Sequence, residues 1–189
     1  MGAIMIDKLP APELATSQWF NTPVPLSLVS LRGRPVFLHT FQLLCPGCVA
    51  QAIPQVRRIE QVFAGSDLQI IGLHTVFEHH AAMTPVTLQA FLHEYRLTSP
   101  VAVDLAEEGM DIPVTMRRYG LQGTPSSVLI GRDGVILHQA FGVEDDIAVG
   151  ARIAMAIAAS LHDRLDGTPD ATACSHDRCT TSASTASAR

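Results

Sequence analysis

The strongest constraint on the fold is a pair of cysteines, Cys45 and Cys48, placed between two segments of different hydrophobic periodicity. Residues 36–41, just before them, form a short, apolar and β-prone run that is typical of a buried strand. Residues 45–63 instead repeat apolar side chains at spacings of three and four, as an amphipathic helix does. The sequence therefore predicts that both cysteines lie where a buried strand leads into the first turn of a helix.

This placement has consequences for the chemistry of Cys45-Pro46-Gly47-Cys48. Two cysteines with this spacing share one face of the first helical turn, within reach of a disulfide. The helix N-terminus carries about half a positive charge, which favours the thiolate of Cys45. The amides of Gly47 and Cys48 have no intrahelical partners and are free to donate to that sulfur. We therefore predict disulfide exchange with Cys45 as the nucleophile and Cys48 as the resolving cysteine.

The remainder of the chain alternates strand-like and helix-like segments. Residues 1–22 are expected to be irregular and residues 23–31 to form an edge strand. Pro54 should kink the first helix, because proline lacks the backbone donor. The hydrophobic patterns predict strands at 36–41, 68–76, 101–103, 127–130 and 135–141, and helices at 45–63, 85–95, 114–119 and 145–165. This order predicts an α/β fold with a mixed central sheet and helices on both faces.

Composition restricts the class of protein. With 47% hydrophobic and 16% charged residues, most of the 189-residue chain is expected to fold. A net charge of −5 and scattered basic residues argue against nucleic acid as a partner. No window approaches the roughly 18 consecutive apolar residues of a membrane span, and no signal-like apolar run is visible. The sequence thus predicts a cytoplasmic protein without a membrane partner, where a cysteine pair is more often catalytic or metal-binding than structural.

The composition predicts three regions along the chain. Residues 1–11 form an irregular N-terminal segment, residues 12–165 the folded domain, and residues 166–189 a disordered tail rich in Ser, Thr and Ala. The tail holds Cys174 and Cys179. These cysteines could chelate a soft metal, form a small-loop disulfide, relay electrons to the first pair, or be incidental to function.

Two motifs in combination resemble the thioredoxin-like superfamily. Residues 36–48 are similar to its strand–active-site–helix unit, and residues 123–126 (Gly-Thr-Pro-Ser) are similar to its cis-proline loop opposite the dithiol. Residues 31–35 and the long segment 65–123 resemble the TlpA and AhpC/TSA redoxin branch, in which a β-α insertion separates the two halves of the fold. The resemblance covers residues 12–160 and implies a thioredoxin fold with that insertion.

The resemblance also implies an activity and a site. The activity would be that of a thiol–disulfide oxidoreductase that works as a disulfide reductase, without an organic cofactor. Its partners would be a disulfide-containing protein or small molecule and an external dithiol reductant. The peptide bond between Thr124 and Pro125 would be cis, with the backbone of Thr124 pairing with the incoming peptide. Pro46, Gly47, Thr124 and Pro125 would then contact the substrate.

Several positions depart from the family pattern. Leu44 replaces the usual Trp, Gln51 replaces the Glu of TlpA-like reductases, and His39 replaces the buried acid that often accepts a proton. His39 could accept the proton of Cys48, or it could be a core residue bonded to the backbone. Gln42 stands where peroxiredoxins carry Thr, which makes a peroxiredoxin-like thiol peroxidase the less favoured alternative.

A second alternative is a soft-metal-binding or redox-sensing protein of the same fold. His74 lies near the end of the second central strand, and His79 and His80 follow in the next loop. Loops at strand ends are where α/β folds build their sites. His74 could therefore tune the Cys45 thiolate or join a metal site with the two cysteines, whereas loop histidines are commonly solvated. We assign no metal ligand on this basis.

Overall fold

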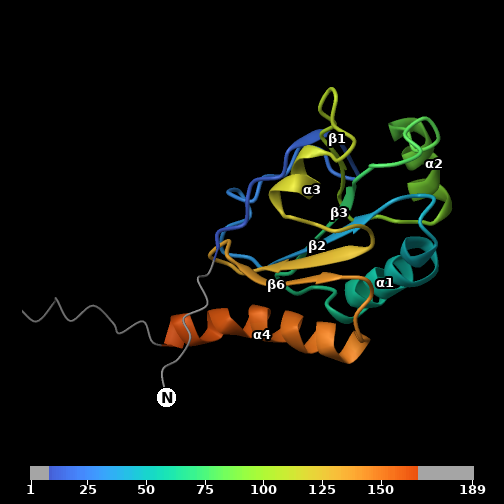
Figure 1. Cartoon of the computed structure of the whole chain (residues 1–189). Helices are drawn as coiled ribbons and strands as arrows, with labels where there is room; N and C mark the ends of the chain where they lie inside the picture. The colour runs from blue at the N-terminus through green and yellow to red at the C-terminus, as the bar shows by residue number, and fades with distance from the viewer. Residues whose placement is uncertain (1–8, 166–189) are drawn as a thin grey trace, which may run out of the picture.

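The computed structural model describes residues 9–165 (Figure 1). The predictions for residues 1–8 and for the tail with Cys174 and Cys179 lie outside the described residues. The strands are β1 (Thr16–Phe20), β2 (Val36–Phe41), β3 (Gln69–His74), β4 (Val101–Asp104), β5 (Ser126–Ile130) and β6 (Ile136–Phe141). The helices are the π-helical turn η1 (Cys48–Ala52), α1 (Ile53–Val62), α2 (Pro85–Glu94), α3 (Val114–Arg118) and α4 (Asp146–Leu165).

All six strands form one mixed sheet in the order β1-β4-β3-β2-β5-β6. Strands β2, β3 and β4 are parallel, so their carboxyl ends meet at one edge of the sheet. Strands β1, β5 and β6 pair antiparallel with their neighbours. Within residues 9–165, no helix combines the length and apolarity that a bilayer span requires.

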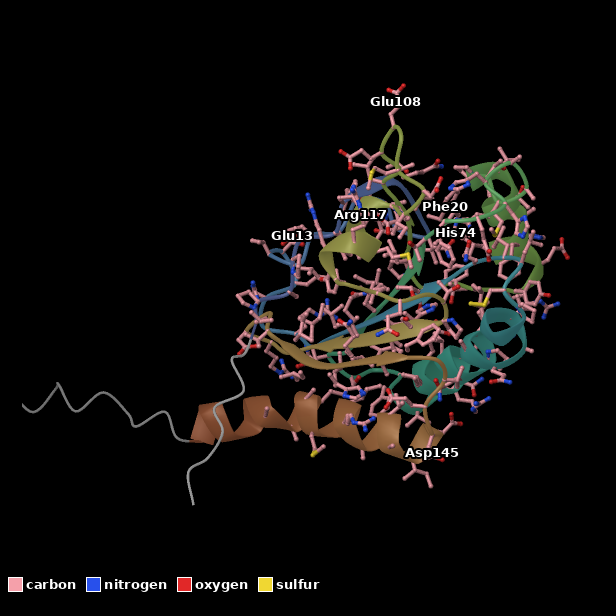
Figure 2. The ribbon with its side chains drawn as sticks, in the orientation of Figure 1. Glu13, Phe20, His74, Glu108, Arg117 and Asp145 are labelled. Atoms are coloured by element: carbon pink, nitrogen blue, oxygen red, sulfur yellow. A yellow bond between two sulfur atoms is a disulfide. The ribbon has the colours of Figure 1, made fainter. Side chains whose placement is uncertain are left out.

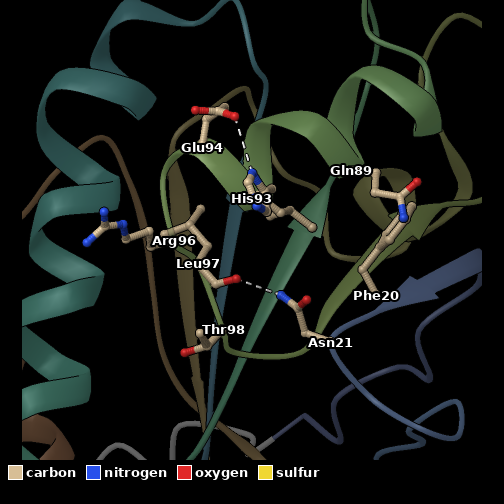
Figure 3. Close-up of a pocket in the computed structure, with 9 residues that line it drawn as sticks. Phe20, Asn21, Gln89, His93, Glu94, Arg96, Leu97 and Thr98 are labelled. Atoms are coloured by element: carbon tan, nitrogen blue, oxygen red, sulfur yellow. Dashed lines mark hydrogen bonds and ion pairs between the residues drawn. The ribbon is translucent and has the colours of Figure 1, made fainter.

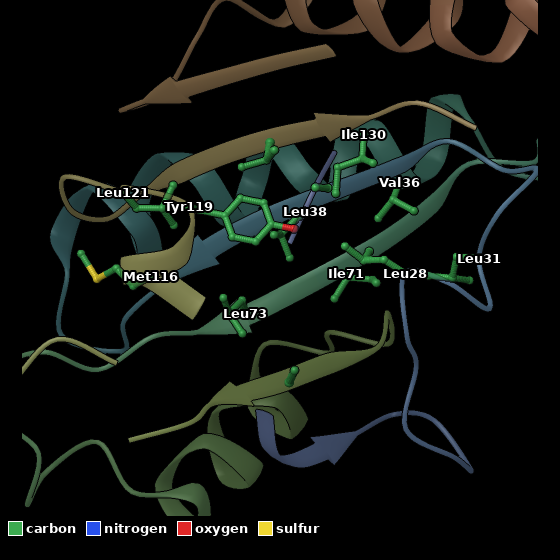
Figure 4. Packing of buried hydrophobic residues seen from close by; sticks show 13 residues of the cluster. Leu28, Leu31, Val36, Leu38, Ile71, Leu73, Met116, Tyr119, Leu121 and Ile130 are labelled. Carbon is green, nitrogen blue, oxygen red and sulfur yellow. The ribbon is translucent and has the colours of Figure 1, made fainter. Parts of the chain in front are cut away.

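The sheet separates two apolar layers, because successive side chains on a strand point to opposite faces. Val36 and Leu38 of β2 pack on one face with Met116 of α3 and with Leu28 and Leu31, which precede β2 (Figure 4). Phe37 packs on the other face with residues of α1 and α4, and Phe41 packs there with residues of α2. Every residue of β2 is buried. The predicted mixed sheet with helices on both faces is therefore confirmed, and the elements β3, α2, β4 and α3 separate α1 from the loop before β5.

The first strand of the sheet differs from the prediction. Residues 23–31 form no strand, whereas Thr16–Phe20, expected to be irregular, is β1 and pairs with β4. Two prolines, Pro23 and Pro25, remove backbone donors from the segment expected to be an edge strand. The turn that follows is fixed by the Glu13 carboxylate, which accepts hydrogen bonds from the backbone amides of residues 28 and 29 at 2.9 and 2.7 Å.

The helix after the cysteines changes its hydrogen-bond pattern just before Pro54, where the sequence predicts a kink. The turn Cys48–Ala52 is π-helical, and the Ile53 amide closes it by donating to the Cys48 carbonyl. Regular α-helix begins at Ile53, with Pro54 in its first turn. Because proline has no N–H, the helix lacks a regular bond at this position, and a wide turn precedes it.

Gly72 of β3 is closely packed against side chains of the two neighbouring strands, β2 and β4. A β-carbon at Gly72 would lie 3.0 Å from Val101 Cγ2, 3.1 Å from His39 Nε2 and 3.2 Å from Phe41 Cε1. We expect Gly72→Ala to lower the free energy of unfolding by about 1–3 kcal/mol, because overpacking displaces these side chains. Urea denaturation measures this change. Gly150→Ala is the matched control, since the space around Gly150 in α4 is open; an equally tolerated Gly72→Ala would contradict the packing described.

Candidate active site

The first helical turn after β2 carries the motif Cys45-Pro46-Gly47-Cys48. Helical structure begins at Pro46, where the missing N–H costs no hydrogen bond. Cys45 is therefore the N-cap residue, and the Cys48 amide donates to its Sγ at 3.2 Å. A side-chain oxygen usually accepts this bond at a helix N-terminus. The sulfur of Cys45 takes that role here. The sequence predicted hydrogen bonds to it from the amides of Gly47 and Cys48, and the structure shows the one from Cys48.

The two cysteines form a disulfide, with their Cα atoms 5.2 Å apart. Their environments differ. Cys48 is fully buried in the cluster that contains Phe41 and Ile53, whereas Cys45 is partly exposed. An incoming molecule therefore meets the sulfur of Cys45 first. This asymmetry supports the predicted order of attack.

The predicted cis-proline loop lies against this turn. The Thr124–Pro125 peptide bond is cis, so this expectation is confirmed. The Thr124 carbonyl oxygen lies 3.5 Å from Cys45 Sγ, and a β-carbon at Gly47 would be 3.5 Å from Pro125 Cδ. The Pro125 carbonyl accepts from the Gly142 amide at 2.8 Å, which ties the loop to the end of β6. The structure thus brings the predicted substrate-contacting residues together around Cys45.

Gln42 belongs to this site, although the sequence did not predict a structural role for it. Its side chain is only 1% exposed. Its Nε2 donates to Thr124 Oγ1 at 3.4 Å, and its Oε1 accepts from the Phe77 amide at 3.4 Å. The only feature of the sequence that could have indicated this role is that an amide side chain directly follows a buried strand. The two partners are distant in sequence, so only the fold reveals the connection.

His39 and His74 are buried on the same face of the sheet, on either side of Phe41. Each imidazole ring lies 5.6 Å from the Phe41 ring, between centroids. Burial lowers the pKa of each histidine to about 4, because desolvation disfavours the charged ring. His39 Nδ1 and both ring nitrogens of His74 have no hydrogen-bond partner among the described residues. Both rings are therefore neutral at pH 7.

The metal-binding hypothesis for His74 receives no structural support. Its side chain is fully buried in the interior of the molecule (Figure 2), whereas His79 and His80 are exposed in the loop between β3 and α2. Within residues 9–165, no group of three or more His, Cys, Asp or Glu side chains has a geometry that could hold a metal ion. The three histidines therefore do not gather with the cysteines.

A pocket of about 730 Å³ lies between the end of β1 and the C-terminal part of α2 (Figure 3). The side-chain amide of Asn21 closes one side by donating to the carbonyls of Leu97 and Ser99 at 2.8 and 3.0 Å. The exposed side chains of His93 and Glu94 also line the pocket, with His93 Nδ1 3.2 Å from Glu94 Oε1. None of the lining residues belongs to the cysteine motif or the cis-proline loop, so this pocket is separate from the disulfide.

Fold and site together define a thioredoxin-like protein with a redox-active CXXC pair. The chain belongs to the Redoxin family, whose family model matches residues 7–151. Protein DipZ of Mycobacterium bovis is 30% identical over 138 residues, which are 71% of this chain and 19% of DipZ. The thiol-disulfide oxidoreductase ResA of Bacillus thuringiensis is 29% identical over 117 residues, which are 62% of this chain and 60% of ResA. The chain therefore spans less than two thirds of the length of either relative.

Solved structures agree with this assignment. A thiol-disulfide isomerase from Corynebacterium glutamicum is 43% identical with a TM-score of 0.76, over 80% of this chain and 98% of that one. A thioredoxin-like superfamily protein is 44% identical with the same TM-score of 0.76, over 78% of this chain and 96% of that one. The predicted thioredoxin fold and the redoxin resemblance are confirmed. The site combines the CXXC pair with a cis-proline loop, as the redoxin resemblance implied.

Proposed function

We propose that the chain is a dithiol–disulfide reductase that works through Cys45 and Cys48. The observation that carries this proposal is the geometry of Cys45. Its sulfur caps the helix, accepts a hydrogen bond from the Cys48 amide and is partly exposed beside the cis-proline loop. The helix N-terminus and the amide both stabilise a thiolate, and the buried Cys48 is held ready to resolve a mixed disulfide.

The proposed reaction has two exchange steps. In the first, the Cys45 thiolate attacks one sulfur of the substrate disulfide; the substrate S–S bond breaks, and its other sulfur leaves as a thiolate that takes up a proton. In the second, deprotonated Cys48 attacks Cys45 Sγ, forms the intramolecular disulfide and releases the second substrate thiol. Two electrons pass to the substrate. An external dithiol then reduces the disulfide and returns the protein to its starting state.

The proton of Cys48 has two proposed acceptors, His39 and water. The pKa of His39, lowered to about 4 by burial, leaves the ring neutral but also makes it a weak base. Phe41 lies beside the His39 ring and also packs in the cluster that contains Cys48. A rate of mixed-disulfide resolution that is unchanged in His39→Leu would assign the proton to water. A rate that falls and loses its pH dependence would assign it to His39.

The reduction potential tests the direction of electron flow. We expect a value near −270 mV, about that of thioredoxin, for the Cys45–Cys48 pair titrated against glutathione. The full chain carrying Cys174→Ser and Cys179→Ser keeps the titration to one pair of cysteines. A value near −120 mV, about that of a strong disulfide oxidant, would replace the reductase proposal by an oxidase. Absence of any reversible two-electron couple would remove the exchange function altogether.

The proposal also covers the substrate, the reductant and the cellular compartment. Relatives named as thiol-disulfide oxidoreductases support a disulfide-containing substrate and a dithiol reductant as the partner classes. The cytoplasmic location remains a prediction from the sequence. Cell fractionation tests it, and recovery of the protein with an extracytoplasmic fraction would contradict it.

A further inference from the structure

Gln42 connects two loops that meet at the carboxyl edge of the sheet. It follows β2 directly, and its side chain is almost fully buried, at 1% exposure. The amide nitrogen donates to Thr124 Oγ1, and the amide oxygen accepts from the Phe77 backbone. Burying an amide is costly unless its hydrogen bonds are made. The side chain therefore favours the arrangement in which both loops are held in place.

The loop held through Thr124 places a carbonyl next to the reactive sulfur. Two backbone groups lie near Cys45 Sγ: the Cys48 amide, 3.2 Å away, and the Thr124 carbonyl oxygen, 3.5 Å away. After reduction, the amide favours a thiolate because it donates to the charged sulfur. The carbonyl favours a thiol, because it accepts from S–H and its partial negative charge opposes a thiolate. The position of the Thr124 carbonyl therefore affects the thiolate fraction of Cys45.

We propose that Gln42 is a positioning residue that holds the Thr124 carbonyl beside Cys45 and thereby limits the thiolate character of the nucleophile. This inference rests on the proposed exchange function and adds to it the group that tunes the dithiol. A smaller thiolate fraction makes the reduced pair less stable relative to the disulfide, which favours donation of electrons. Gln42 thus biases the pair toward reduction of its substrate.

The test compares two matched variants of the full chain, Gln42→Met and Gln55→Met. Methionine keeps the length of glutamine and removes its hydrogen bonds. Gln55 is buried to a similar degree, at 7% exposure, and its Nε2 donates to the Glu144 carbonyl and to Asp146 Oδ1, both at 2.7 Å. These contacts join α1 to the start of α4, away from the cis-proline loop. Gln55→Met therefore reports the effect of losing a buried amide without moving Thr124.

Two measurements separate positioning from stability: the equilibrium constant with glutathione, and the pH midpoint of alkylation of Cys45. We expect Gln42→Met to shift the equilibrium at least threefold toward the reduced dithiol, which is about 15 mV for a two-electron couple. The alkylation midpoint should move to lower pH in the same variant. Gln55→Met should lower the stability and leave both values at those of the wild type.

Thr124→Val supplies a second variant, since it removes the Oγ1 partner of Gln42 and keeps the backbone carbonyl. It should reproduce the shift, including where Gln42→Met fails to fold. Wild-type values in Thr124→Val and in folded Gln42→Met would overturn the inference while leaving the exchange function intact. An equal shift in Gln55→Met would overturn it as well, because general loosening would then explain the effect. Failure of the wild type to show any couple would instead count against the proposed function.

Discussion

Replacing Cys45 with serine is expected to abolish disulfide reduction, with a loss of at least about a thousandfold in turnover. Serine keeps the N-cap hydrogen bond but cannot attack a disulfide at neutral pH, because its hydroxyl remains protonated. The helix start is therefore preserved while the nucleophile is removed. Steady-state reduction of a protein disulfide measures the loss, and circular dichroism checks that the fold is retained.

The double substitution Cys174→Ser with Cys179→Ser is the control for this loss. These two cysteines lie in the tail, outside the described residues, and the sequence left open a role for them as an electron relay. If Cys45 is the nucleophile, the tail variant retains reduction of the substrate when dithiothreitol supplies the electrons directly. Substantial activity in Cys45→Ser together with its loss in the tail variant would transfer the nucleophile to the tail.

Acid is expected to destabilise the fold through His39 and His74. The pKa of each is lowered from 6.5 to about 4 by burial. Above pH 6.5 both rings are neutral in the folded and unfolded chains. As the pH falls from 6.5 to 4, only the unfolded chain takes up these protons, so stability decreases by about 3 kcal/mol for each histidine. The free energy of unfolding, measured by urea titration between pH 7 and pH 4.5, should fall steeply.

Substitution with leucine isolates this effect from the titration of carboxylates. The double variant His39→Leu with His74→Leu should lose most of the difference in stability between pH 7 and pH 4.5. It should also equal or exceed the wild type in stability at pH 7, because unpartnered ring nitrogens are removed from the core. His93→Leu is the control, since the His93 side chain is 85% exposed. An unchanged pH dependence in the double variant would contradict the burial of neutral histidines.

The sequence predicts most of the fold because the central elements carry strong local patterns. The apolar run 36–41 coincides with β2, and the predicted helix 85–95 coincides with α2, which Thr84 caps and Pro85 begins. The prediction fails at Thr16–Phe20, which has no clear alternation. That segment is a strand because its backbone pairs with β4. The partner lies more than eighty positions away, so the local sequence carries no pattern that predicts the pairing.

The site is predictable in its nucleophile and less so in its surroundings. Cys45 and Cys48 follow from their spacing at a helix start, the cis bond before Pro125 was implied by the family resemblance, and the structure brings them together. Gln42 and Thr124 are 82 positions apart in the sequence. Their hydrogen bond therefore depends on the sheet, which brings the two loops together. His74 falls inside the predicted strand 68–76 and ends β3, but its complete burial away from any metal cluster did not follow from the sequence.

Trapping the mixed disulfide tests the central claim most directly. The full-length Cys48→Ser protein, reduced and mixed with a disulfide-containing peptide, should accumulate a covalent adduct, because the resolving thiol is gone while Cys45 remains. Peptide mapping by mass spectrometry locates the adduct, and the account predicts it on Cys45. No adduct, or an adduct only on Cys174 or Cys179, would contradict the assignment of Cys45 as the nucleophile.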